Sequence, residues 1–465
     1  MRTIRLAAVV LLSGFITANA AVFTVSPDGS GTYATIQQAM DMAQDGDVIE
    51  LLDGVFRGPG NYNIDFLGKA VELRSQSGDA EACILDVNGI NGNWEPERGL
   101  LFVNEEGPET IVHDITIMNA DADGSCPQCE GGALLIRNSS PVFHNVIMKN
   151  NYAINGAGAF VDGLEEPTPA PKFYNCQFIN NTGFVGVGVE LVGGKAFFYD
   201  CIFVGNTATS NGFAAAVRVF NNAGMLMDGC TVAYNNAQFA SAFEIYDSPV
   251  LIKNSIIAYN SGDQAIRITS ESQVYVRYSL IAGNDGRDWP KAIGEQKQGH
   301  GNLTVEPGFV GSLMRQPVYL SASSACIDAG DPSSSLDPDD TRRDIGALYF
   351  SQVDDLRPVD NEPFQVATSA TSQGGVPDQF RLTPLHPNPF NAMTTVTLAL
   401  PDLDMVQLRV LDVLGRERAL LHQGPLSAGS HDFTVNATDF ASGIYFVVAE
   451  SSAHGRQVQK AVLAK

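Results

Sequence analysis

Six side chains recur at one position of a repeated phrase, and their types would suit an extended sugar chain. They are His144, Tyr174, Tyr199, Asp228, Lys253 and Arg277. Aromatic rings can stack on the C–H faces of sugars, so the first three are the predicted substrate-binding residues. The last three are the predicted catalytic residues, with Lys253 or Arg277 as the proton abstractor of a β-elimination. A solvated corner that carries a ladder of charges is the alternative interpretation.

A second group of candidate ligands precedes this column. The run Asp121-Ala122-Asp123-Gly124-Ser125 is an oxygen-rich loop of the kind that calcium uses, and it predicts Asp121, Asp123 and Glu130 as calcium ligands. Cys126 and Cys129 are interpreted as a local disulfide that closes an inserted loop, because zinc would need two further ligands that are not evident. A later acidic cluster suits calcium or plain solvation equally well: Asp328, Asp331, Asp337, Asp339, Asp340 and Asp344.

The elements that would position these residues come from an internal repeat. The phrase spans residues 143–151, 173–181, 198–206, 227–235, 252–260 and 276–284, with a fainter copy at 112–120. Apolar residues within each copy alternate with period two, as at Cys201 and Phe203, which indicates strands and excludes helical repeats. We therefore expect one coil of a β-solenoid per repeat, with equivalent residues stacked about 4.8 Å apart.

Stacking in register predicts several columns of like residues. Phe143, Phe173 and Phe198 begin one interior column, and Leu134, Ala159 and Val189 begin another. A small-residue column follows Ala133, Gly158, Gly188, Ala216, Ala242 and Ala265 and lets the wall bend. The asparagines that end each phrase are expected at one corner, in the left-handed conformation and with amides bonded along the stack: Asn151, Asn181, Asn206, Asn235, Asn260 and Asn284.

Two further columns are interpreted as structural features and not as functional sites. Cys176, Cys201 and Cys230 are interpreted as buried free thiols, with a disulfide between stacked neighbours as the alternative. Glu190, Arg218, Glu244 and Arg267 alternate in sign in successive coils and predict a cross-strand ladder of ion pairs.

Residues 21–350 resemble the right-handed parallel β-helix superfamily of pectate lyases, pectin esterases and polygalacturonases. The resemblance rests on the repeat, on the opening Pro27-Asp28-Gly29-Ser30-Gly31-Thr32 with its downstream amphipathic helix, and on the closing run 324–347. It implies an all-β solenoid with an N-terminal capping helix. The esterase and common lyase signatures are absent, and Gly299-His300-Gly301 alone matches a polygalacturonase motif, so the fold implies no particular reaction.

Residues 381–465 are similar to the type A sorting domain of the bacterial type IX secretion system. Pro387-Asn388-Pro389-Phe390-Asn391, the run 441–446 and the terminal run 459–465 carry the resemblance, and the alternating strand patterns predict a small antiparallel β-sandwich. The resemblance implies contact with the secretion machinery and passage across a Gram-negative outer membrane, followed by release or surface attachment. An ordinary immunoglobulin-like binding module is the alternative.

The remaining segments are a predicted signal peptide and a predicted linker, and the net charge limits the class of partner. Residues 1–20 have the basic start, short apolar run and Ala18-Asn19-Ala20 site of a signal peptide cut after Ala20, and residues 351–380 have the composition of a linker. A net charge of −24 argues against nucleic acid, and no segment is apolar enough to span a membrane.

These features predict an exported protein that engages a polysaccharide or cell-surface glycan. If the protein is an enzyme, we expect a polysaccharide lyase or a glycoside hydrolase. A noncatalytic surface or adhesion protein with the solenoid as a rigid scaffold is the alternative. Acidity is concentrated in residues 21–140, which would repel a polyanion, so neutral glycans or calcium-dependent binding are favoured.

Overall fold

A computed structural model describes residues 20–464, apart from 89–95, 165–167, 270, 311–317 and 353–379 and a few turns in the C-terminal module (384, 389, 401–403, 414–415, 427–428, 439 and 452–454). The chain divides into two compact units, Met1–Asp360 and Asn361–Lys465. The predicted signal peptide, up to residue 19, and most of the predicted linker lie outside the described residues.

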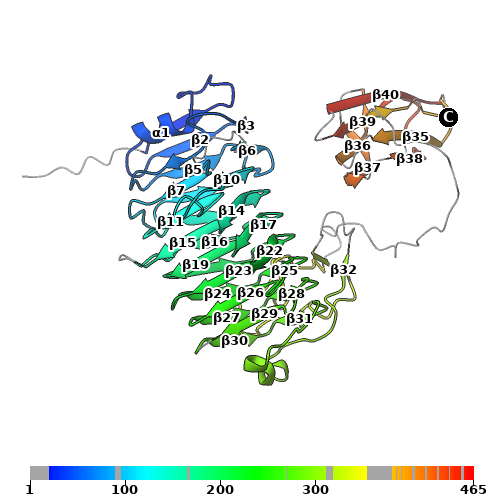
Figure 1. Ribbon diagram of the computed structural model, residues 1–465. Coiled ribbons are helices and arrows are strands. Elements are labelled where there is room, and N and C mark those ends of the chain that lie inside the picture. Colours follow the sequence, from blue (N-terminus) through cyan, green and yellow to red (C-terminus); the bar gives the residue numbers. More distant parts are fainter. Residues whose placement is uncertain are drawn as a thin grey trace, which may run out of the picture. The chain divides into compact units, whose positions relative to one another are not determined.

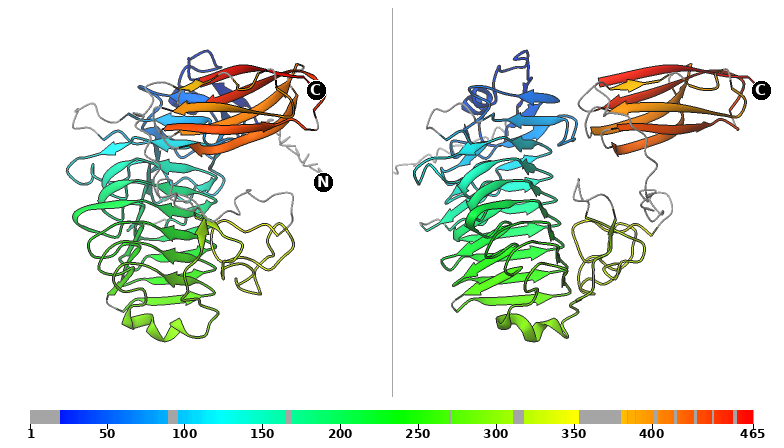
Figure 2. Two further views of the ribbon diagram at one scale, coloured as in Figure 1. Left: turned by 90° about the vertical axis from the view of Figure 1, so that its right-hand side faces the viewer. Right: turned by 45° about the vertical axis from the view of Figure 1, so that its right-hand side comes forward.

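The first unit is a parallel β-solenoid, as predicted, in which each coil adds one strand to each of several sheets (Figures 1 and 2). Sheet A contains β1 (Val22–Val25), β2 (Val48–Leu51), β5 (Glu72–Ser75), β8 (Ile111–His113), β12 (Val142–His144), β16 (Lys172–Tyr174), β20 (Lys195–Tyr199), β24 (Gly224–Asp228), β27 (Pro249–Lys253) and β30 (Gln273–Arg277).

The other walls of the solenoid are sheets B, C and D. Sheet B contains β3 (Gly54–Phe56), β6 (Cys83–Asp86), β9 (Thr116–Met118), β13 (Ile147–Lys149), β17 (Gln177–Ile179), β21 (Ile202–Val204), β25 (Thr231–Ala233), β28 (Ile256–Ala258) and β31 (Leu280–Ala282). Sheet C contains β4 (Ile64–Asp65), β7 (Leu100–Phe102), β11 (Leu134–Arg137), β15 (Ala159–Gly163), β19 (Val189–Gly193), β23 (Val217–Phe220), β26 (Phe243–Tyr246) and β29 (Ile266–Thr269). The short sheet D contains β10 (Asp121–Ala122), β14 (Tyr152–Asn155), β18 (Thr182–Val185) and β22 (Thr207–Phe213).

The core is built from the interior columns that the repeat predicts. Phe143 pairs in register with Phe173, and Phe173 with Phe198, and all three side chains are fully buried. Their rings stack with centroids 4.8 and 5.0 Å apart. In the small-residue column, a Cβ on Gly158 would lie 2.4 Å from the carbonyl oxygen of Gly188. Bulky columns therefore fill the interior, and small residues allow neighbouring coils to approach closely.

The asparagine ladder runs along one corner and is buried over most of its length. Asn206 Oδ1 accepts from the backbone N–H and the side-chain amide of Asn181, and its own amide donates to Asn235 Oδ1. The predicted left-handed conformation is wrong for these residues. It belongs instead to the residue before each of them: Asn150, Asn180, Gly205, Tyr234, Tyr259 and Gly283. That preceding residue makes the turn, which leaves the ladder asparagine free to point inward.

The interior cysteine column consists of free, buried thiols. The backbone N–H of Cys201 donates to Cys230 Sγ at 3.4 Å, and that of Cys230 donates to Ser255 Oγ at 3.0 Å. The column therefore acts as a ladder of acceptors parallel to the asparagines, and none of its members forms a disulfide. Burial raises the pKa of the Cys201 thiol well above its ordinary value, which keeps it protonated.

The outer face of sheet C carries the predicted ladder of ion pairs. Arg218 lies between Glu190 at 2.8 Å and Glu244 at 3.1 Å, and Arg267 lies 3.2 Å from Glu244. The Glu190 side chain is only 4% exposed, and its Oε2 has no hydrogen-bond partner in the described part of the chain. Burial raises the pKa of Glu190, and the neighbouring Arg218 opposes that shift.

A short helix lies near each end of the solenoid. At the N-terminal end, helix α1 (Ile36–Met42) buries Ile36, Ala39 and Met40 in the common core. At the other end, the 3₁₀-helix η1 (Lys291–Lys297) follows the buried Trp289 and lies against β30. The Gln296 side chain accepts from the N–H of Val276 at 2.7 Å and donates to the carbonyl of Val274 at 2.8 Å.

A closing segment, residues 318–350, returns across the outer face of sheet B (Figure 1). Leu320, Cys326 and Ile345 pack on the outward side chains of β28 and β31, and the nearby hairpin pairs β32 (Phe309–Val310) with β33 (Tyr319–Leu320). The acidic cluster of this segment mostly accepts hydrogen bonds from nearby groups. Asp344, for example, accepts from the N–H groups of Asp328 and Phe350.

The second unit is an antiparallel β-sandwich, as predicted. One sheet contains β34 (Arg381–Leu382), β35 (Met393–Leu400) and β38 (Gly429–Asn436), and the other contains β36 (Asp404–Asp412), β37 (Glu417–Leu426), β39 (Gly443–Ser451) and β40 (Gly455–Leu463). Alternate residues of the strands, such as Val396, Leu398 and Leu400, enter a separate core.

Candidate functional site

The predicted site residues form one continuous column on the outer face of sheet A. Register pairs link each member to the next in chain order. The column also continues toward the N-terminus, because His144 pairs with His113, His113 with Arg74 and Arg74 with Glu50. We call the following set the polar column: His113, His144, Tyr174, Tyr199, Asp228, Lys253 and Arg277. Period-two alternation puts these side chains outward, because their neighbours in each strand belong to the core.

The aromatic part of the polar column presents ring edges to solvent. The rings of His144 and Tyr174 stack with centroids 4.8 Å apart and planes 9° apart, and those of Tyr174 and Tyr199 stack at 4.8 Å and 10°. Tyr174 therefore has a ring on each face, and the expectation that a sugar would stack on its face is wrong. What the column offers is a row of hydroxyl and imidazole edges suited to hydrogen bonding.

The outer members of the ring stack, His144 and Tyr199, are uncharged at neutral pH. Burial lowers the pKa of His144, with a further contribution from the nearby His113. Burial raises the pKa of Tyr199, with smaller contributions from Tyr174 and Asp228. Neutral imidazole and phenol groups can each both donate and accept hydrogen bonds, as sugar hydroxyls do.

A second outward column, which sequence reasoning missed, lies two residues earlier in each strand. We call it the apolar column: Ile111, Val142, Lys172, Phe197, Leu226, Leu251 and Tyr275. Its members are partly or fully exposed, with Tyr275 49% exposed, and Lys172 contributes its aliphatic stem. The sequence could have revealed the apolar column, because both residues that flank a core position in a strand must point outward. Two examples are Phe197 and Tyr199 around the core residue Phe198, and Leu251 and Lys253 around Ile252.

The charged end of the polar column is partly neutralised. Lys253 Nζ lies 2.9 Å from Asp228 Oδ2, and the Asn254 amide donates to the other oxygen of Asp228 at 2.7 Å. Arg277 is exposed and has no ion pair within the part of the chain that the structure describes. The structure therefore brings the three predicted catalytic residues onto adjacent coils, with Lys253 held in an ion pair.

The closing segment borders this charged end. Arg343 pairs with Asp200, which occupies the turn after Tyr199, and the N–H of Asp331 donates to Asn254 Oδ1. Gly229 leaves room for this pair, because a Cβ there would lie 2.0 Å from the Arg343 guanidinium. Burial raises the pKa of Asp200 to about 6, although Arg343 opposes the shift. A carboxyl group with a raised pKa thus lies beside the predicted catalytic residues.

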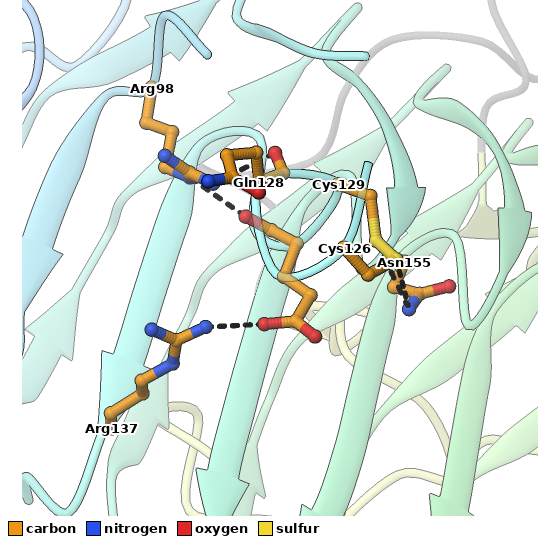
Figure 3. The surroundings of a disulfide bond; sticks show 7 residues. Arg98, Cys126, Gln128, Cys129, Arg137 and Asn155 are labelled. Carbon is orange, nitrogen blue, oxygen red and sulfur yellow. Dashed lines mark hydrogen bonds and ion pairs between the residues drawn. A yellow bond between two sulfur atoms is a disulfide. The ribbon is translucent and has the colours of Figure 1, made fainter. Parts of the chain in front are cut away.

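The predicted calcium ligands are not brought together as one cluster. Glu130 forms an ion pair with Arg137, and Asp121, on β10, has a buried Oδ1 without a hydrogen-bond partner among the described residues. Burial raises the pKa of Asp121. Among the described residues, the one set of three metal-type ligands within 4.8 Å of one another is Cys126, Cys129 and Glu130. The two cysteines form a disulfide with each other, so they are not available as ligands in this state (Figure 3).

Comparison with known families decides the nature of the second unit. The family model described as a secretion system C-terminal sorting domain matches residues 384–464. The second unit is a sorting domain. A type IX sorting domain implies secretion or attachment at the outer surface, and it makes the secretion machinery a partner of this chain. No helix among the described residues is both long and apolar enough to cross a membrane.

No curated protein matches the chain. Among solved structures, the pectate lyase Pel9A is 14% identical with a TM-score of 0.40, over 72% of this chain and 97% of that one. The enzymatically active domain of tailspike protein 4 of bacteriophage CBA120 is 12% identical with a TM-score of 0.21, over 90% of this chain and 62% of that one.

Proposed function

We propose that the protein is exported to bind an extended polysaccharide along the outer face of sheet A. The observation that carries the proposal is the pairing of the two outward columns over seven successive coils, one apolar and one polar. A sugar chain is amphipathic in the same way, with C–H faces and hydroxyl edges. Its faces would pack on the apolar column, and its hydroxyls would exchange hydrogen bonds with the polar column.

The charge of this surface favours a neutral glycan over most of its length. His144 and Tyr199 are uncharged at neutral pH, and Asp228 and Lys253 form an ion pair with each other. Arg277, at the far end, could accommodate one acidic sugar or substituent. A uniformly anionic chain would gain little here, since few unpaired cations face it.

Removing the Tyr199 hydroxyl tests the proposal directly. We expect Tyr199→Phe to weaken binding about fivefold, since one hydrogen bond contributes about 1 kcal/mol, and Tyr199→Ala to weaken it further. Affinity electrophoresis against a panel of soluble neutral and acidic polysaccharides measures the effect. Tyr246→Phe is the matched control, because Tyr246 is 42% exposed on sheet C, outside the proposed surface. If Tyr199→Phe and Tyr246→Phe changed the affinity equally, the polysaccharide would not bind at the polar column. A panel without any binding would favour the scaffold role.

Cleavage of the bound chain is the second candidate function. The observation that favours it is the position of Asp228, Lys253 and Arg277 on adjacent coils of the surface on which the chain would lie. Lys253 would have to leave its ion pair with Asp228 before it could accept a proton, whereas a guanidinium stays protonated and suits charge stabilisation better.

An assay for unsaturated or reducing chain ends, with and without calcium, tests cleavage. We expect Lys253→Ala to abolish product formation, and Arg277→Ala to reduce it at least tenfold, if elimination occurs at this site. Lys195→Ala is the control, because Lys195 is an exposed lysine on the same sheet. Activity that survives both substitutions would remove these residues from the reaction, even if the protein is an enzyme.

A further inference from the structure

The disulfide loop has properties that closing a short loop does not explain. Cys126 and Cys129 are three positions apart, and so short a loop gains the least stability from a cross-link. Cys126 is exposed, whereas Cys129 is fully buried. The two sulfurs of one bond thus differ sharply in their access to solvent.

The loop is held in place without its disulfide. The Arg98 guanidinium donates to the carbonyl oxygens of Gln128 and Glu130, at 2.9 and 2.7 Å (Figure 3). The backbones of residues 129–131 and Asn155 exchange two further hydrogen bonds of 3.0 Å. Glu130 is itself fixed by its ion pair with Arg137. None of these contacts involves a sulfur atom, so opening the sulfur–sulfur bond does not require the loop to unfold.

A hydrogen-bond donor also faces the sulfurs. The side-chain amide nitrogen of Asn155 lies 3.6 Å from Cys129 Sγ and 4.0 Å from Cys126 Sγ, both within the range of N–H···S bonds (Figure 3). A donor at Cys129 stabilises the thiolate that leaves when the other sulfur is attacked, and a better leaving thiolate speeds exchange. An exposed sulfur, a buried partner and a donor to that partner are the features required for directional attack.

We propose that Cys126 and Cys129 form an exchange-active disulfide that reacts with small or protein-borne thiols. A donor thiolate attacks Cys126 Sγ to form a mixed disulfide; the Cys126–Cys129 bond breaks, and its electron pair leaves on Cys129 Sγ. A second donor thiolate then attacks the donor sulfur and releases Cys126. The donors end as one disulfide, and their two protons end on the two cysteines. The proposal is independent of polysaccharide binding.

Native-state exchange with glutathione tests this proposal on the full chain. After incubation with reduced glutathione and alkylation of the folded protein, we expect label at the exposed Cys126, at unchanged far-UV circular dichroism. A second alkylating reagent, added after denaturation, should then label the buried Cys129, which stays disulfide-bonded and unlabelled without glutathione. The five other cysteines are an internal control, because all are buried free thiols and label only when the chain unfolds: Cys83, Cys176, Cys201, Cys230 and Cys326. Labelling of Cys126 only together with these five, or no labelling of Cys126 at all, would overturn the proposal.

Single variants test the direction of attack and the role of Asn155. We expect Cys129→Ser to form a mixed disulfide with oxidised glutathione at Cys126, and Cys126→Ser to react at least tenfold more slowly at Cys129. Asn155→Ala should slow reduction of the native disulfide several-fold, whereas Asn236→Ala, at an exposed asparagine near β25, should not change the rate. Equal reaction of the two serine variants, or equal rates for the two alanine variants, would contradict the mechanism.

Discussion

Asn206→Ala is expected to lower the free energy of unfolding of the solenoid by about 4 kcal/mol, one of the two largest effects that we predict. Asn206 is fully buried in the middle of the asparagine ladder. The substitution removes the acceptor of the Asn181 backbone N–H and the donor to the carbonyl of Phe178. Water cannot reach these groups, so each lost partner leaves a desolvated polar atom, at about 1–3 kcal/mol each. Urea titration followed by far-UV circular dichroism measures the loss.

The last asparagine of the ladder provides the comparison. Asn284 makes the same kinds of hydrogen bond, with Asn260 and Ile257, but it is partly exposed, so water can replace the lost partners. Asn284→Ala should therefore lower the free energy of unfolding by only about 1 kcal/mol. Asn236→Ala, one residue after the ladder position in its coil, should have almost no effect. If Asn206→Ala were as mild as Asn284→Ala, the ladder would not be the main polar support of the stack.

Arg218→Met is expected to lower the free energy of unfolding by about 3 kcal/mol at pH 7, because it leaves two buried carboxylates without their shared cation. The loss should shrink as the pH falls toward 4. Burial already raises the pKa of Glu190, and removal of Arg218 raises it further. The folded variant therefore binds a proton more readily than the unfolded chain, so its stability falls as the pH rises through the folded-state pKa. Urea titrations at several pH values measure this slope.

Two further variants separate charge from packing. Glu190→Gln in the Arg218→Met background should recover part of the stability at pH 7 and flatten the pH dependence, because the uncompensated charge is gone. Arg267→Met should have a smaller effect of about 1 kcal/mol, since Arg267 ends the ladder and is one-third exposed. A pH-independent loss in Arg218→Met would show that lost packing, and not the buried charges, explains it.

The solenoid fold was predictable because the same sequence pattern occurs in each coil. Each copy of the phrase independently places an apolar residue inside and an asparagine at the corner, so Phe143, Phe173 and Phe198 could be aligned from the sequence and are stacked in the structure. The left-handed residue was misplaced by one position. Asparagine suits both the left-handed turn position and the ladder position. In the Asn-Asn pairs at 150–151 and 180–181 the sequence therefore did not show which asparagine makes the turn and which joins the ladder.

The candidate surface was only half predictable. Residue types placed His144, Tyr174 and Tyr199 in one column, but the stacking of their rings depends on side-chain torsions, which the alternation of residues does not specify. The contact of Arg343 with Asp200 joins residues 143 positions apart. No local pattern encodes such a pairing, because it depends on how the closing segment returns over sheet B.

The Gln296 contacts at the end of sheet A have a consequence for the length of the molecule. A stack of parallel strands ends in unpaired N–H and carbonyl groups that can recruit another chain and grow into a fibre. The amide of Gln296 occupies the N–H of Val276 and the carbonyl of Val274, just where the next strand would add. A side chain thus imitates a peptide group and occupies the groups at the end of sheet A to which a further strand would bind.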